Sequence, residues 1–369
     1  MALGTRKAFH SETVFGSGFE HEQKIKDQIA AQKSGLGVDP APMEMNITTR
    51  VDHFNGSNSD TYEMRYIIDW SHYNSSQGPI LFYAGNEGGI WNFYNNSGFV
   101  TKTLAEKYGA LVVFAEHRYY GTSMPFGNET FEKDNLRFLT IEQVMWDYVD
   151  LLNFIKANET DTGLKDRATI LFGGSYGGML ASWMRMKYPN HFQGALASSA
   201  PILWFEGKTD PNAYTVVASK VFKKMGGQEC YDLLSRGFYE LTNLMYDPSK
   251  YQGIKDTFNM CDVPTHPANI TTLIGIMSDS LGTMAMVNYP YPTNFVNPLP
   301  AWPMMEACVQ AKTFPPSSGP GEGESVFNFT NVMALQRAAN VFYNHTGQEA
   351  CLDIKEEQSS GLDTSGWTV

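Results

Sequence analysis

The segment from Ala168 to Pro189, ATILFGGSYGGMLASWMRMKYP, constrains the fold more than any other part of the sequence. It begins with an apolar, β-branched run typical of a buried strand and ends with apolar residues at helical spacing. Between them, the glycine-rich turn contains the pattern G-x-S-x-G around Ser175. A sharp turn from strand to helix strains the serine backbone, and side chains flanking it would clash. The segment predicts a nucleophile elbow at Ser175; a glycine-rich turn without chemistry is the alternative.

Two backbone N–H donors are expected beside this serine. Tyr176 opens the following helix, where its N–H can stabilise a developing oxyanion. A second glycine-rich loop, Gly85-Asn86-Glu87-Gly88-Gly89, follows an earlier strand, and Gly88 is the candidate for the second donor. Glu87 either orients this loop or contacts a substrate amine. The alternative is an ordinary turn at the end of a strand.

The first half of the chain alternates strand and helix patterns, which is typical of a parallel sheet covered by helices on both faces. A possible capping box, Thr140 with Gln143, marks the start of one helix. The expected strands cover residues 61–70, 110–121, 168–175 and 194–202, and residues 78–89 are a short apolar run that opens into a glycine-rich loop. The expected helices cover 99–109, 141–155 and 176–188. The sequence therefore predicts the α/β class.

After about residue 204 the pattern becomes helical, with helices expected at 213–225, 229–246, 270–287 and 331–343. A proline-rich aromatic stretch (288–303) and a flexible stretch (315–325) interrupt them. We expect an N-terminal extension over residues 1–45, an α/β core over 46–203 and a mostly helical domain over 204–369.

Composition and cysteine usage exclude several classes. The net charge is −12 without a basic run, which argues against nucleic acid or an anionic membrane as a partner. No apolar run approaches the roughly 20 residues of a membrane-spanning helix, and the first residues lack the apolar core of a secretory signal. The four cysteines, Cys230, Cys261, Cys308 and Cys351, lack metal or redox spacing. They favour two disulfides in an oxidising compartment over four buried thiols.

Acceptor sequences for N-glycosylation also favour export. They occur at Asn46, Asn55, Asn74, Asn95, Asn128, Asn158, Asn269, Asn328 and Asn344. The alternative is that an asparagine-rich chain contains such triplets without modification.

A serine nucleophile needs a base, and none is convincing. Only His191, His266 and His345 follow Ser175, and each is expected in a structural or surface position. His117, in Glu116-His117-Arg118, ends a core strand before the serine, and we expect it in a buried ion pair.

Several motifs together resemble one family. GGSYGGMLASWMRMKYP, FYAGNEGG, LVVFAEHRYYG, VDHFN and MVNYPYPTNFVNPLPAWP are similar to the lysosomal Pro-X carboxypeptidase and dipeptidyl peptidase 2 family of serine peptidases. PLPAWP and the CLDI…GW ending look closer to the Pro-X carboxypeptidase branch. The resemblance implies an α/β-hydrolase sheet with a helical, disulfide-linked cap. It also implies cleavage next to proline, in a lysosome or after secretion, without a metal or cofactor.

Carried over by position, the resemblance makes Ser175 the acylated nucleophile and Tyr176 an oxyanion donor. Met179 matches a residue of the proline pocket, although a core position is equally compatible. The implied disulfides are Cys230–Cys308 and Cys261–Cys351. The expected partners are proline-containing peptides, with a homodimer left open.

The departures from the family pattern concern the loop and the ends of the chain. Gly89 stands where the family usually has aspartate. The family's aspartate and histidine fall beyond Val369, and a leader would precede Met1. We expect a truncated isoform, an incomplete gene model or a fragment whose sheet lacks its last strands, with little or no activity. The other hypotheses are a non-catalytic glycoprotein that binds peptides or a partner, and an esterase or lipase on the same fold.

Overall fold

The computed structural model describes residues 41–158, 163–313 and 329–354. The chain divides into two compact units, and the boundary lies between Ile202 and Leu203. Within the described residues, no helix combines the length and apolar character needed to cross a membrane.

The first unit is built on a six-stranded sheet with the order β1-β2-β4-β3-β5-β6. Strands β3 to β6 run parallel, whereas β1 and β2 pair antiparallel at one side. The strands are β1 (Met43–Arg50), β2 (Thr61–Asp69), β3 (Ile80–Ala84), β4 (Leu111–Ala115), β5 (Thr169–Gly174) and β6 (Gly194–Ser198). Every residue of β3 and β4 is buried, as expected where helices cover both faces of a parallel sheet.

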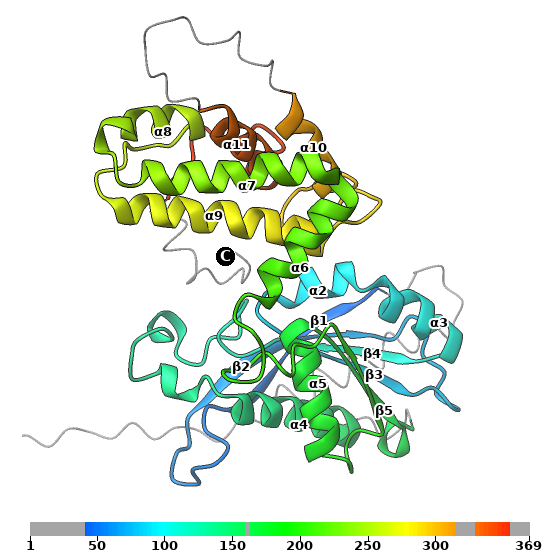
Figure 1. Ribbon diagram of the computed structural model, residues 1–369. Coiled ribbons are helices and arrows are strands. Elements are labelled where there is room, and N and C mark those ends of the chain that lie inside the picture. The colour runs from blue at the N-terminus through cyan, green and yellow to red at the C-terminus, as the bar shows by residue number, and fades with distance from the viewer. Residues whose placement is uncertain (1–40, 159–162, 314–328, 355–369) are drawn as a thin grey trace, which may run out of the picture. The chain divides into compact units, whose positions relative to one another are not determined.

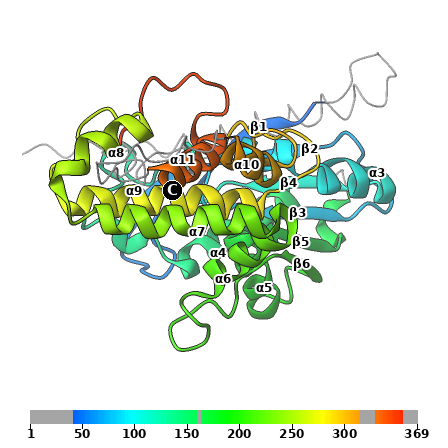
Figure 2. The same ribbon diagram turned by 45° about the horizontal axis from the view of Figure 1, so that its top comes forward.

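Helices cover both faces of this sheet (Figures 1 and 2). On one side lie α4 (Ile141–Asn158) and α5 (Ser175–Lys187); on the other lie α2 (Ile90–Asn96), a π-helical turn (Phe99–Leu104) and α3 (Ala105–Tyr108). This arrangement is the α/β-hydrolase sheet, which confirms the expected fold class.

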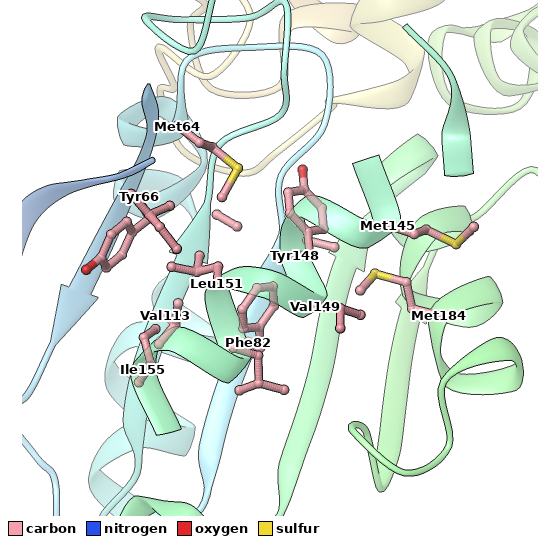
Figure 3. Packing of buried hydrophobic residues seen from close by; sticks show 14 of the residues in the cluster. Met64, Tyr66, Phe82, Val113, Met145, Tyr148, Val149, Leu151, Ile155 and Met184 are labelled. Carbon is pink, nitrogen blue, oxygen red and sulfur yellow. The ribbon is translucent and has the colours of Figure 1, made fainter. Parts of the chain in front are cut away.

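Alternation along the strands builds the core beneath α4. Phe82 and Val113, two residues into their strands, project toward the side of the sheet where Tyr148, Val149 and Ile155 descend from α4 (Figure 3). All five side chains are fully buried. Residues spaced by the 3.6-residue period of α4 thus pack against alternate residues of the strands and form one apolar layer.

The start of α4 differs in detail from the expected capping box. Thr140 Oγ1 accepts a hydrogen bond from Gln143 N at 3.3 Å. The Gln143 side chain instead donates to Asp52 and accepts from the His53 backbone, at 2.8 and 2.9 Å. The helix start is therefore tied to the segment after β1.

The second unit is helical and has its own apolar core. Its helices are α6 (Ala213–Val221), a π-helical turn (Phe222–Gly226), α7 (Gly227–Leu244), α8 (Tyr251–Phe258), α9 (Pro267–Met286), α10 (Pro303–Lys312) and α11 (Thr330–Tyr343). The helix pattern did not predict α8, which has eight residues, or α10, which begins inside the proline-rich stretch. Proline is well suited to the first position of a helix because its missing N–H would have no intrahelical acceptor there.

Two disulfides link this helical unit. Cys230 in α7 bonds Cys308 in α10, and Cys261 bonds Cys351. They join residues 78 and 90 positions apart, so each restricts a long loop of the unfolded chain.

The predicted glycosylation sites differ in accessibility. Asn46, Asn55, Asn74, Asn95 and Asn128 are exposed. Asn269 and Asn344 are partly buried and accept hydrogen bonds from the His266 and Glu349 backbones, respectively. The side chain of Asn158 and the whole of Asn328 lie outside the described residues.

Candidate active site

Ser175 stands at the junction of β5 and α5 and has a φ of +53°. A non-glycine residue in this left-handed region costs about 1–2 kcal/mol, so the surrounding structure must impose the conformation. A Cβ on Gly173 would lie 2.1 Å from the Gly177 carbonyl oxygen, and a Cβ on Gly177 would lie 2.6 Å from the Ala84 carbonyl oxygen. The glycines are needed because the elbow folds tightly on itself and against the end of β3.

Tyr176 follows the serine in the first turn of α5, where backbone N–H groups have no intrahelical acceptor. Its hydroxyl lies 3.1 Å from Nε2 of His117. The other ring nitrogen, Nδ1, lies 2.6 Å from the carbonyl oxygen of Arg118 and must donate its hydrogen there. Tyr176 therefore donates to an unprotonated Nε2, and both its backbone and its ring are fixed beside Ser175.

The predicted ion pair of His117 is wrong. The ring is buried, and this burial lowers the pKa of His117 to about 4. A neutral imidazole with one donor and one acceptor satisfies both of its neighbours, whereas an imidazolium would lose the hydrogen bond from Tyr176.

The ion pairs belong to the residues on either side of His117. Glu116 accepts from Nε and Nη2 of Arg65 at 3.0 and 2.6 Å. Arg118 donates to both carboxylate oxygens of Asp147 at 2.6 and 2.8 Å. Burial opposes ionisation of Asp147, but the positive charge and hydrogen bonds of Arg118 hold its pKa below the usual value.

The Gly85–Gly89 loop lies against the elbow. Since β3 and β5 are parallel neighbours, their carboxyl ends meet at one edge of the sheet. Asn86 is buried there, and its Oδ1 would lie 3.1 Å from a Cβ on Gly177. Gly85 is held by its own N–H, which donates to Ala115 O at 3.1 Å, and by its carbonyl, which accepts from Tyr148 Oη at 2.7 Å.

The hydrogen bonds within this loop bear on the second oxyanion donor. Gly88 N donates to the carbonyl oxygen of Asn86 at 2.7 Å, so the predicted donor is already engaged. Asn86 Nδ2 donates to the carboxylate of Glu87 at 3.0 Å, which turns this partly buried side chain toward its neighbour. In the described part of the chain, the N–H of Glu87 has no hydrogen-bond acceptor. The Glu87 N–H is therefore a candidate for the second donor in place of the Gly88 N–H.

Met179 is 8 % exposed and lies one turn into α5. This position is compatible with the expected pocket role and with a core role, and the pocket role stays a prediction.

No histidine of the described residues is hydrogen-bonded to Ser175. His53 lies 2.7 Å from Asp147, His266 caps the start of α9, and His345 is exposed. His191 lies in the turn after α5, with its N–H bonded to Tyr188 O at 3.0 Å. His191, His266 and His345 thus hold the structural or surface positions expected of them.

Comparison with known proteins identifies the lineage of this site. Residues 49–368 match the serine carboxypeptidase S28 family. The chain belongs to this family. It is 38% identical over 320 residues to the lysosomal Pro-X carboxypeptidases of Mus musculus and Homo sapiens, matching 86% of this chain and 62% of each relative. It is 37% identical over 305 residues to the prolyl carboxy peptidase like protein 5 of Caenorhabditis elegans, matching 81% of this chain and 57% of the relative.

The match to these S28 relatives thus spans a little under two thirds of their length. Among solved structures, the metagenomic carboxylesterase EstE1 overlaps 56% of this chain and 62% of its own, at 14% identity and a TM-score of 0.32. This overlap is small and adds nothing to the fold assignment.

Sequence reasoning did not predict the roles of three residues that organise this S28 site: Glu116, Tyr148 and Asn86. For Glu116, the sequence did contain a signal of its role. Three polar residues, Glu116-His117-Arg118, follow directly on the fully apolar strand β4, and charged groups that enter a core need specific partners.

Proposed function

We propose that this chain carries the nucleophile half of a serine exopeptidase that hydrolyses peptide bonds next to proline. The observation that carries this proposal is Ser175 at a φ of +53°, on a strand-to-helix turn that only glycines permit. Membership of the S28 family supports the reaction class. The relatives named Pro-X carboxypeptidase support proline as the recognised residue and a lysosomal or secreted location.

In this mechanism, Ser175 Oγ attacks the carbonyl carbon of the scissile bond as its proton passes to a base. The backbone N–H groups of Tyr176 and of the Gly85–Gly89 loop stabilise the negative oxygen that forms. The C–N bond then breaks, the amine leaves with a proton, and an acyl group remains on Ser175. Water hydrolyses this acyl-enzyme and frees the serine.

The described residues contribute the nucleophile and the oxyanion donors to this reaction. Because no described histidine contacts Ser175, we expect slow turnover by this sequence alone. Loss of a base and its acid lowers rates by about 10⁴–10⁶ while oxyanion stabilisation remains.

The test combines covalent labelling with substrate comparison. A fluorophosphonate probe should modify Ser175 slowly, with the adduct located by peptide mass spectrometry, and Ser175→Ala should remove it. Peptides with proline before the last residue, peptides with proline in second position and short acyl esters should then be compared. Labelling elsewhere, or turnover of esters without turnover of prolyl peptides, would contradict the proposal.

A further inference from the structure

Two adjacent residues, Glu116 and His117, connect the end of β4 to both sides of the Ser175 turn. We propose that they are positioning residues for the oxyanion site: Glu116 fixes the Gly85–Gly89 loop and His117 fixes Tyr176. This inference rests on the proposed function, because it concerns how the same site stabilises negative charge.

Glu116 is completely buried and its carboxylate is fully used. Oε1 accepts from Arg65 and from the backbone N–H of Ile90 at 2.9 Å, directly after the glycine-rich loop. Oε2 accepts from the backbone N–H groups of Thr122 and Ser123 at 3.0 and 3.1 Å. A single carboxylate thus fastens the end of the loop to the turn after β4.

The opposite end of the loop is fastened independently. The N–H and carbonyl of Gly85 bond to Ala115 and Tyr148, as described above. With Gly85 and Ile90 both held, the four residues between them span a fixed distance beside the elbow. Loss of the Glu116 contact would free one end of the segment that supplies the second donor.

His117 acts on the other half of the site. Its Nε2 accepts a hydrogen bond from the hydroxyl of Tyr176, and its Nδ1–H donates a hydrogen bond to Arg118 O. The Tyr120 ring also packs edge-on against the imidazole, with centroids 5.2 Å apart. This imidazole therefore restrains the side chain of Tyr176, whose backbone N–H is the proposed first oxyanion donor.

Glu116 and His117 hold the two proposed donors from the same strand end. Glu116 N donates to Arg65 O at 3.0 Å, so the dipeptide continues the pairing of β4 with β2. Oxyanion stabilisation depends on donors held at about 2.7–3.1 Å before the charge appears. A strand in the centre of the sheet is a rigid element from which to hold two donors that belong to different loops.

The experiment separates oxyanion stabilisation from proton transfer to a base and from folding. In a Ser175→Cys background the nucleophile is a thiolate at mildly alkaline pH and needs no base. All four natural cysteines are in disulfides, so the introduced thiol is unique. Acylation by the p-nitrophenyl ester of acetyl-proline passes through an oxyanion, whereas alkylation by iodoacetamide does not. The ratio of the two rate constants reports on the donors and not on thiol exposure or pKa.

Glu116→Gln and Tyr176→Phe should each lower this ratio by about tenfold, since removal of a whole oxyanion donor costs about 10²–10³. His117→Leu should lower the ratio as much as Tyr176→Phe does. His117→Gln retains a hydrogen-bond acceptor near the position of Nε2, so its ratio should be close to that of the Ser175→Cys parent. Asp69→Asn is the matched control: this buried carboxylate bonds Tyr94 at the opposite edge of the sheet. Its ratio should be unchanged.

Each other outcome is decisive. Acylation and alkylation that fall together, or a ratio unaffected by Tyr176→Phe, would overturn the positioning role while leaving the proposed function intact. If the thiol of the Ser175→Cys chain is acylated no faster than that of the urea-unfolded chain, the elbow has no oxyanion site. That result would overturn the proposed function and this inference with it. Tyr176→Phe keeps the test conclusive if Glu116→Gln does not fold.

Discussion

The hydroxyl of Tyr176 lies 3.1 Å from Nε2 of His117, a buried imidazole whose pKa is lowered to about 4. The ring thus stays neutral in the folded protein down to pH values at which an exposed histidine is fully protonated. The contact beside Ser175 is therefore preserved in mildly acidic surroundings.

The lowered pKa of His117 makes the free energy of unfolding depend on pH. Burial lowers this pKa from 6.5 to about 4, so the unfolded chain binds the extra proton at higher pH than the folded one. The stabilisation is complete above about pH 6.5 and is lost as pH falls toward 4, by up to about 3 kcal/mol. Between pH 7 and 4.5, the free energy of unfolding measured with urea should change less with pH in His117→Gln than in the unmodified protein. An equal dependence on pH in His117→Gln and in the unmodified protein would contradict the assignment.

The left-handed conformation of Ser175 should reverse the usual order of alanine and glycine. At φ +53° alanine retains the strain and glycine does not. Ser175→Gly should therefore equal Ser175→Ala in stability or exceed it by up to about 1 kcal/mol. At Ser182, inside the same helix, glycine should be less stable than alanine by about 0.5–1 kcal/mol. Thermal and urea unfolding of the four variants measure both differences. The same order at both positions would mean that Ser175 is not strained.

The close approach of Gly177 to β3 should make the elbow intolerant of a single methyl group. In Gly177→Ala the new Cβ would meet the Ala84 carbonyl oxygen at 2.6 Å, and the backbone must shift at a cost of about 1–3 kcal/mol. Gly275, inside α9, has open space where a Cβ would project, with no atom within 4 Å, so Gly275→Ala should stabilise by about 0.5–1 kcal/mol. Differential scanning calorimetry should show the two changes with opposite signs.

The buried pair of Arg118 and Asp147 should be among the most sensitive contacts of the first unit. Arg118 also donates to the carbonyl oxygens of Val51 and Phe138 at 2.9 and 3.0 Å. Arg118→Met leaves Asp147 in the core with its contacts to His53 and Tyr62 but without the guanidinium that pairs with both of its oxygens, and should destabilise by about 3–5 kcal/mol. The double variant Arg118→Met/Asp147→Leu should lose less than the sum of the single variants.

The exposed Arg137 provides the control for Arg118. It lies over the ring of Phe138, so Arg137→Met should cost less than about 1 kcal/mol. Guanidinium unfolding followed by circular dichroism measures Arg118→Met, Asp147→Leu, their double variant and Arg137→Met against the unmodified protein. A loss for Arg118→Met as small as that for Arg137→Met would show that the buried pair is dispensable.

The predicted elements that proved most accurate were those with long periodic patterns. The elbow at Ser175, the helix after it and the long helices α4, α7, α9 and α11 followed from apolar spacing. The strand predicted over residues 110–121 was too long, because β4 ends at Ala115. The polar residues Glu116, His117 and Arg118 break the apolar pattern after it, and they are buried outside the strand.

The sequence by itself determined the serine turn, because a strand pattern, four glycines and a helix pattern are local and leave little conformational choice. Tertiary structure decided what surrounds that serine. Glu116 meets Arg65 across 51 residues of chain, and His117 meets Tyr176 across 59. Such contacts depend on strand order and on which strand ends share an edge of the sheet. For this reason the same three residues, read as one buried ion pair in the sequence, act in the fold as two ion pairs with a neutral imidazole between them.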